Sequence, residues 1–286
     1  MTIELVAALI VLLVLIVWPE SAVNLRRFGW YHRWLDALDF AEGGGRVALA
    51  LIVPVLLCAV IAHFLQGRML DWAGLAFAVL ILFYALGPRE LEGDIEAILD
   101  TDDPALRTAA TERLRSVPDG APRAFTAAEL VEAAVMASLR RRFAVLFWFF
   151  LLGPAGALGY RLAWVSTATD DPRTRHAARR FASALDWIPA HLMVLAMALV
   201  SNFDAVTGTW RAWHDQPGHS MENLDPGFLA AVARSGVDAD VAAGDESNTD
   251  IRDPITELTD ARRLMQRVLI VWLAVIALIV LAGWIA

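Results

Sequence analysis

The sequence predicts an all-α, polytopic integral membrane protein with four to five membrane segments, two of them broken or re-entrant, plus short cytoplasmic helices. Hydrophobic residues make up 58% of its 286 residues, and the mean hydropathy is +0.52. Soluble domains are nearer one half apolar, so the lipid bilayer is an expected partner. Several apolar runs are close in length to the about 20 residues that a membrane-spanning helix requires. Two of them contain glycine or proline where an ordinary membrane helix is smooth.

Residues 1–87 are expected to form an N-terminal region of three membrane helices, at Leu5–Trp18, Val47–Leu65 and Trp72–Gly87. The first run lacks the basic start and the small-residue cleavage site of a signal peptide, so we expect it to remain uncleaved. Arginines that follow this run place the first loop in the cytoplasm by the positive-inside rule, and the N-terminus outside.

Residues 88–142 are expected to form a cytoplasmic helical segment. Pro88 suits the first turn of one helix, and Asp103-Pro104 is typical of the cap and first turn of a second. Thr126-Ala-Ala-Glu129 fits a capping box that starts a third helix, which we expect to run on toward the membrane. The segment contains eight arginines, which favours a cytoplasmic location.

Residues 143–211 are expected to contain the two broken membrane segments and a basic connecting helix. Phe143–Tyr160 is interrupted by Gly153-Pro154-Ala155-Gly156, and Trp187–Phe203 is interrupted by Pro189. Asp170-Asp171-Pro172 opens the connecting helix, which is expected to end near residue 185. If both segments crossed the bilayer, this arginine-rich connection would lie outside; re-entrant segments would keep it inside. Both arrangements are compatible with the sequence.

Residues 212–263 form an acidic polar region, and residues 264–286 are expected to be a C-terminal transmembrane helix. Residues 212–261 carry 11 acidic residues against two arginines. Much of 238–253 is rich in Asp, Gly, Ser and Asn, so we expect it to be flexible. Arginines before the last apolar run place its start inside and the C-terminus outside.

Composition excludes several classes of chemistry. All 24 basic residues are arginine, and without lysine neither a Walker-type phosphate loop nor a Schiff-base mechanism is possible. A net charge of −8 argues against nucleic-acid binding. The single cysteine, Cys58, cannot form an intrachain disulfide or a cysteine metal site. We predict no protein metal site, and the sequence identifies no catalytic residue.

Ionisable residues at the mouths of the broken segments are the candidate ligand-binding residues, because charge at membrane depth is costly and usually functional. Arginine suits an anionic small molecule, and the aspartates can supply oxygen ligands or fix the arginines. Glu132 can neutralise a nearby arginine, or hold a divalent cation together with water and a phosphate. The candidates are Glu132, Arg140, Arg141, Arg161, Asp186, His191 and Asp204.

The chain resembles the AmpE family of bacterial inner-membrane proteins, described as regulatory signalling modulators linked to β-lactamase induction. The resemblance spans essentially the whole chain. It rests on the final helix and on Arg142-Phe143, Leu146-Phe147-Trp148, Gly153-Pro154, Tyr160 and Asp186-Trp187-Ile188-Pro189. It implies a location in the bacterial inner membrane, and the orientation expected from the arginines would then place both termini in the periplasm.

The same features are similar to the CbiB/CobD family, membrane-bound synthases that condense adenosylcobyric acid with an aminopropanol or its phosphate. The shared features are Phe147-Trp148, Gly153 to Gly156, Tyr160-Arg161 and Trp187-Ile188-Pro189. The synthase pattern has acidic and amide residues roughly where this chain has Met136, Arg140 and Arg141. His191 stands where both families usually have arginine.

The leading hypothesis is therefore a non-catalytic regulator or sensor of the AmpE type, linked to β-lactamase induction and cell-wall recycling. It would bind an anionic small molecule near the broken segments. The alternatives are an amide-forming synthase related to CbiB/CobD, for which Mg²⁺ is an implied cofactor, and a small-molecule transporter with a site at its broken helices. Small residues such as Gly153 and Gly159 also suit a homodimer or internal packing.

Overall fold

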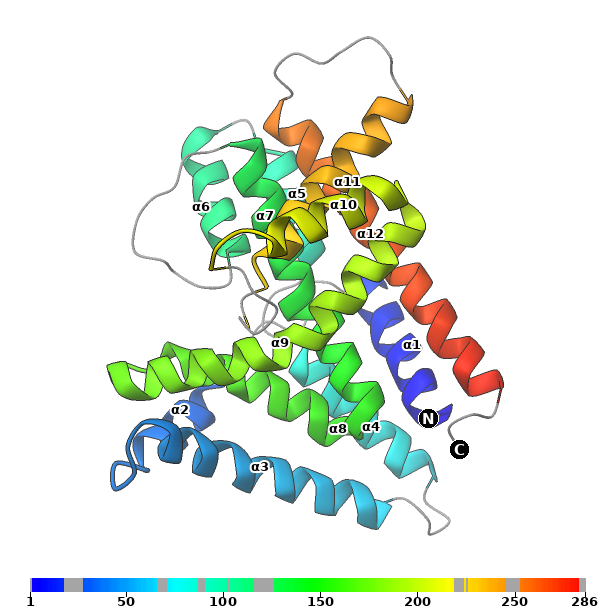
Figure 1. Ribbon diagram of the computed structural model, residues 1–286. Coiled ribbons are helices and arrows are strands. Elements are labelled where there is room, and N and C mark those ends of the chain that lie inside the picture. Colours follow the sequence, from blue (N-terminus) through cyan, green and yellow to red (C-terminus); the bar gives the residue numbers. More distant parts are fainter. Residues whose placement is uncertain are drawn as a thin grey trace. The chain divides into compact units, whose positions relative to one another are not determined.

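The regular elements in the described parts of the chain are all helices (Figure 1). The computed structural model describes residues 2–17, 28–65, 71–86, 91–101, 103–115, 126–218, 224, 226–244 and 253–282. Stretches long and apolar enough to cross a membrane are Gly43–Leu65, Ala127–Ala168, Pro172–Val200 and Pro254–Leu281. Shorter apolar stretches include Ile3–Leu15 and Trp72–Ala85. The chain is thus an all-α, multi-pass membrane protein, as the sequence predicts.

The helices group into two compact units. The first unit contains residues 1–90, 144–185 and 276–286, and the second contains 91–143 and 186–275. At residues 185–186 and 275–276 the chain passes between the units inside a helix, so the division does not follow helix ends there. Each unit has a hydrophobic core of its own.

The first unit is built around α8 (Ala144–Val165). It packs against α3 (Gly43–Leu65) and α4 (Asp71–Ala85), and α4 also packs against α1 (Thr2–Val17). The short helix α2 (Gly29–Asp36) adds the buried Tyr31, whose hydroxyl lies 2.7 Å from Ser166 Oγ. Burial raises the pKa of the Tyr31 hydroxyl to about 12.

The second unit contains the short polar helices. Leucine and isoleucine side chains of α5 (Leu91–Leu99), α6 (Pro104–Leu114), α7 (Ala127–Ser138) and α12 (Pro254–Leu281) form one buried cluster. Beside it, α10 (Phe203–His214) packs on α11 (Phe228–Gly244), which packs on α7.

Local capping rules predict several helix starts correctly. Asp103 Oδ1 accepts a hydrogen bond from the Ala105 amide at 2.8 Å, with Pro104 in the first turn of α6. Thr126 caps α7 by accepting from the Glu129 amide at 3.4 Å. The expected start at Pro88 lies outside the described residues.

The acidic stretch 238–253 differs in part from its prediction. Helix α11 continues to Gly244, so the first part of the stretch expected to be flexible is helical. Residues 245–252 lie outside the described residues.

Of the two interruptions predicted from the sequence, the structure contains one. In α8, Gly153 has φ +67° and ψ −157°, a conformation that is essentially restricted to glycine, and Pro154 follows it. The interruption predicted there is confirmed. Helix α9 (Pro172–Val200) instead runs unbroken through Pro189, so the break predicted there and the helix end expected near residue 185 are wrong. A helix can accommodate an internal proline by giving up one backbone hydrogen bond and bending.

Candidate functional site

Three consecutive arginines occupy a π-helical turn in the second unit. The turn η1 (Leu139–Phe143) follows α7 and leads into α8. A π turn places an extra residue in a helix and is frequent at functional sites. Because consecutive side chains point in different directions around a helix, each arginine meets a different neighbour.

Arg140 and Asp186 form the most deeply buried ion pair made by the three arginines of this turn. Arg140 Nε lies 3.3 Å from Asp186 Oδ2, and the Asp186 side chain is 0% exposed while that of Arg140 is 18% exposed. A carboxylate that is fully removed from water requires a paired charge. The pair joins η1 to α9, and both of its members are predicted site residues that the structure brings into contact within this unit.

Arg141 is held by the helices that precede it. Its guanidinium contacts Asp94 Oδ2 of α5 at 2.5 Å and donates to the carbonyl oxygens of Arg113 at 2.6 Å and Leu114 at 3.2 Å. The last carbonyls of a helix lack internal donors, so Arg141 also caps the C-terminus of α6.

Arg142 belongs to a shared network with α12. Its guanidinium lies 3.3 Å from Glu92 Oε1, while Arg262 contacts Glu92 Oε2 at 2.6 Å and Glu96 Oε1 at 2.7 Å. Together with the pairs above, the network opposes four guanidinium groups with four carboxylates. These arginines are therefore balanced by acidic side chains of the same unit.

The remaining charged candidates do not join this network. Glu132 of α7 is half-buried, and none of the ion pairs within the described residues involves it. Asp204 is exposed in the first turn of α10, where a negative charge suits the helix N-terminus. Arg161 lies in the first unit, where it is buried and its Nε donates to the Ala85 carbonyl oxygen.

His191 lies in a cluster of aromatic rings contributed by α9, α10 and α11. Its ring centroid is 4.3 Å from that of Trp187, 4.6 Å from that of Phe228 and 6.2 Å from that of His214. His191 Nδ1 lies 2.7 Å from the Trp187 carbonyl oxygen, and His191 Nε2 is buried with no hydrogen-bond partner among the described residues. If Nδ1 donates to that carbonyl, Nε2 is an acceptor.

The rest of this aromatic cluster was not predicted. Trp210 and His214 of α10 lie one turn apart, and Trp213 and Phe228 pack beside them. The tryptophan-rich end of α10 was the available signal, but the sequence does not show that it packs beside His191. These rings pack on one another around the buried Nε2 atom of His191.

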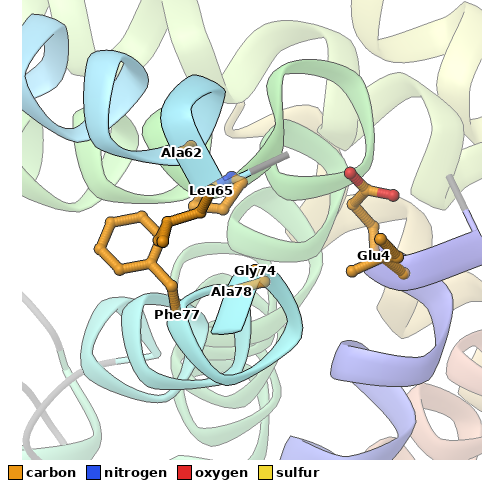
Figure 2. A pocket seen from close by; sticks show the side chains of 8 residues that line it. Glu4, Ala62, Leu65, Gly74, Phe77 and Ala78 are labelled. Atoms are coloured by element: carbon orange, nitrogen blue, oxygen red, sulfur yellow. The ribbon is translucent and has the colours of Figure 1, made fainter. Parts of the chain in front are cut away.

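A small cavity beside Glu4 was also not predicted. Figure 2 shows Glu4 of α1 on one side, with Ala62 and Leu65 of α3 and Phe77 of α4 on the other. The cavity measures about 10 Å³, which is close to the space of one water molecule. A lone carboxylate at the start of an apolar run was the sequence signal for it.

The described residues contain no group of three or more His, Cys, Asp or Glu that could hold a metal ion. Asp94, Asp186, Glu92 and Glu96 each face a guanidinium group. Mg²⁺ prefers several oxygen ligands in octahedral geometry. These carboxylates therefore do not fit a magnesium site as they stand.

Comparison with known proteins finds similarity to "Cobalamin biosynthesis protein CobD" of Chromobacterium violaceum. The identity is 31% over 170 residues, which are 56% of this chain and 54% of that protein. The chain thus spans about half the length of the curated relative that it matches. No protein-family model and no solved structure matches the chain. The comparison supports the CobD side of the resemblance and does not extend to AmpE.

Proposed function

We propose that this protein is a membrane-bound, amide-forming synthase of the CbiB/CobD type that acts on a corrinoid acid in cobalamin biosynthesis. The observation that carries the proposal is the 31% identity to a cobalamin biosynthesis protein. The resemblance implies a reaction between the carboxyl group of cobyric acid and the amine of an aminopropanol or its phosphate. Because this condensation releases water and is unfavourable in water, the carboxyl group requires activation, for which ATP is the expected co-substrate.

We place the substrate at the second unit, near Glu132, Arg140, Asp186 and His191. His191 Nε2 is a buried polar atom without a hydrogen-bond partner in the described part of the chain, and it lies among rings that can stack on a planar group. The Arg140–Asp186 pair would hold η1 and α9 together beside the substrate and would not itself bind the substrate. No step is assigned to Mg²⁺, since the carboxylates face guanidinium groups.

The test combines a genetic and a biochemical assay. A strain that lacks its own CobD should regain corrinoid-dependent growth when it expresses this chain. In the presence of ATP, membranes that contain the chain should join cobyric acid to aminopropanol phosphate. The amide product is detected by mass spectrometry. Failure of both assays with protein that is folded and inserted would contradict the proposal.

A regulator of the AmpE type is the second candidate, because this chain departs from the synthase pattern at three positions. The synthase resemblance implies acidic and amide residues roughly where this chain has Met136, Arg140 and Arg141. Here both arginines are neutralised by Asp186 and Asp94. A deletion strain would then lose inducible β-lactamase control, and complementation would restore it without any corrinoid amide formation.

We further propose a location in the bacterial inner membrane, with residues 88–142 in the cytoplasm and both termini in the periplasm. The arginine bias of the loops supports this orientation. Alkaline phosphatase fused to the C-terminus should be active, because that enzyme requires the periplasm. A fluorescent protein inserted at residue 120 should also be bright, since that site would be cytoplasmic. The opposite pair of results would reverse the orientation.

A further inference from the structure

The first half of α9, residues 172–185, has one buried face and one exposed face that is basic. Ala178 and Ala182 are buried in the hydrophobic core of the first unit. The exposed residues that form what we call the basic face of α9 are Arg173, His176, Arg179 and Arg180. Arg173, His176 and Arg180 follow one another at intervals of three and four residues, so they lie on the same side of the helix.

The chain supplies few acidic partners for the basic face. The first half of α9 contains no Asp or Glu, and Asp171, which precedes the helix, accepts hydrogen bonds from its first turn. Arg173 lies 2.7 Å from Glu42, but the two side chains are 77% and 76% exposed, so water and salt weaken this pair. Among the residues that the structure describes, no ion pair involves Arg179 or Arg180. In contrast to the arginines of η1, the basic face is therefore open to an anion from outside the chain.

The basic face begins at the level of the membrane surface. Glu42, which contacts Arg173, directly precedes the spanning stretch Gly43–Leu65 of α3, so this contact lies at one end of a membrane helix. The first half of α9 also shares its core cluster with α2, which lies close to it in Figure 1. Helix α2 exposes Trp30 and Arg33, a combination typical of the membrane–water interface.

A phosphate group attached to a lipid suits this face best. Guanidinium groups bind phosphate oxygens through paired hydrogen bonds. Phe181, next to Arg180, is 46% exposed. Arginines together with an exposed aromatic ring are typical of helices that lie against lipid headgroups, where the ring reaches the boundary with the acyl chains. A free phosphate would gain nothing from Phe181, whereas a phospholipid would contact both the arginines and the ring.

We propose that the basic face of α9 binds the headgroup of an anionic phospholipid, whose phosphate contacts Arg179 and Arg180. Phe181 then lies beside the glycerol and the first part of the acyl chains. The site is independent of the proposed synthase function, because its residues belong to the first unit and the candidate substrate residues belong to the second.

Photo-crosslinking of the full chain in phosphatidylcholine nanodiscs tests the site. The probe is a small amount of phosphatidylglycerol with a diazirine in the first part of one acyl chain, and phosphatidylcholine with the same diazirine is the reference. Labelled peptides are identified by mass spectrometry. Residues 172–185 should take up about fivefold more label from the anionic probe, or a larger excess, because each arginine near an anionic surface strengthens binding about fivefold. The excess should shrink at higher salt, since exposed charges are screened.

Two double variants and a matched control separate this site from general charge attraction. Arg179→Gln with Arg180→Gln removes both unpaired charges and should bring the label from phosphatidylglycerol down to that from phosphatidylcholine. Arg179→Lys with Arg180→Lys keeps the charges and should retain an excess. Arg211→Gln with Arg234→Gln is the control, because it removes two exposed arginines from α10 and α11 and should leave the label on residues 172–185 unchanged.

Other outcomes would overturn the proposal. Equal label from both probes in the unaltered chain, or an excess that persists in the double glutamine variant, would exclude a headgroup site. Loss of the excess in the control variant would show that only the total charge matters. Inorganic phosphate added at constant ionic strength should not displace the label, and displacement would mean that the face binds soluble phosphate instead. If the double glutamine variant does not fold, Arg180→Gln alone should lower the excess about fivefold, and an unchanged excess would contradict the site.

Discussion

Replacing Asp186 by asparagine should destabilise the second unit, because Asp186 is the fully buried member of an ion pair. The substitution removes the carboxylate charge that Arg140 contacts at 3.3 Å, while the asparagine retains the shape of the side chain. Breaking a buried ion pair from one side typically costs about 3–5 kcal/mol. Arg140 keeps 18% exposure and can turn its charge partly toward the surface, so we expect about 2–4 kcal/mol.

Equilibrium unfolding in mixed micelles, followed by the fluorescence of the 11 tryptophans, measures this loss. Adding Arg140→Gln to Asp186→Asn should cost little more, giving a coupling free energy of about 1–3 kcal/mol in a double-mutant cycle. Asp204→Asn is the control, because Asp204 is exposed in a helix first turn and should cost below about 1 kcal/mol. An Asp186→Asn cost under about 0.5 kcal/mol, or strict additivity, would refute the reasoning.

Three further substitutions test local features. Gly153→Ala should lower the free energy of unfolding by about 1–3 kcal/mol, because φ is +67° at this position. Gly208→Ala, which also has room for a Cβ, is the control and should be neutral or stabilising. Equal effects of the two substitutions would contradict this. Asp103→Ala should cost about 1 kcal/mol by removing the α6 cap, and an unchanged midpoint would show that the cap contributes nothing. The pKa of Asp171 is lowered by hydrogen bonds from the Thr174 hydroxyl and amide. The ionised Asp171 therefore stabilises the fold fully above the ordinary pKa of 3.8, and this stabilisation is lost as the pH falls through the lower pKa of the folded state. Asp171→Asn should remove this pH-dependent contribution to stability, which thermal melts recorded between pH 3 and 7 would show.

The features that could be predicted from sequence are those set by neighbouring residues. Hydropathy over about 20 residues identifies the membrane helices, and the caps at Asp103 and Thr126 require only the next three residues. Gly153-Pro154 predicts an interruption because no other pair of residues combines such freedom with a missing donor. Pro189 shows the limit of this logic, since α9 continues through it as one helix.

The partners of the arginines could not be predicted because they are distant in sequence. Arg141 meets Asp94, 47 residues earlier, and Arg262 meets Glu92, 170 residues earlier. No periodicity within one helix reports such pairing. The aromatic neighbours of His191 come from three helices and were missed for the same reason.

This pairing changes what kind of ligand the second unit can recognise. Counting arginines suggests an anion pocket, but a bound anion would have to displace Asp186, Asp94 or Glu92, each of which is already in contact with a guanidinium. His191 Nε2 is buried among aromatic rings, and no described residue hydrogen-bonds to it. Under the substrate placement proposed above, His191 and the rings around it, rather than the arginines, would contact the ligand. Loss of activity in an Arg140 variant would therefore first indicate a loss of stability. The His191→Phe variant keeps an aromatic ring but lacks Nε2, so loss of activity in folded protein of this variant would indicate a loss of binding.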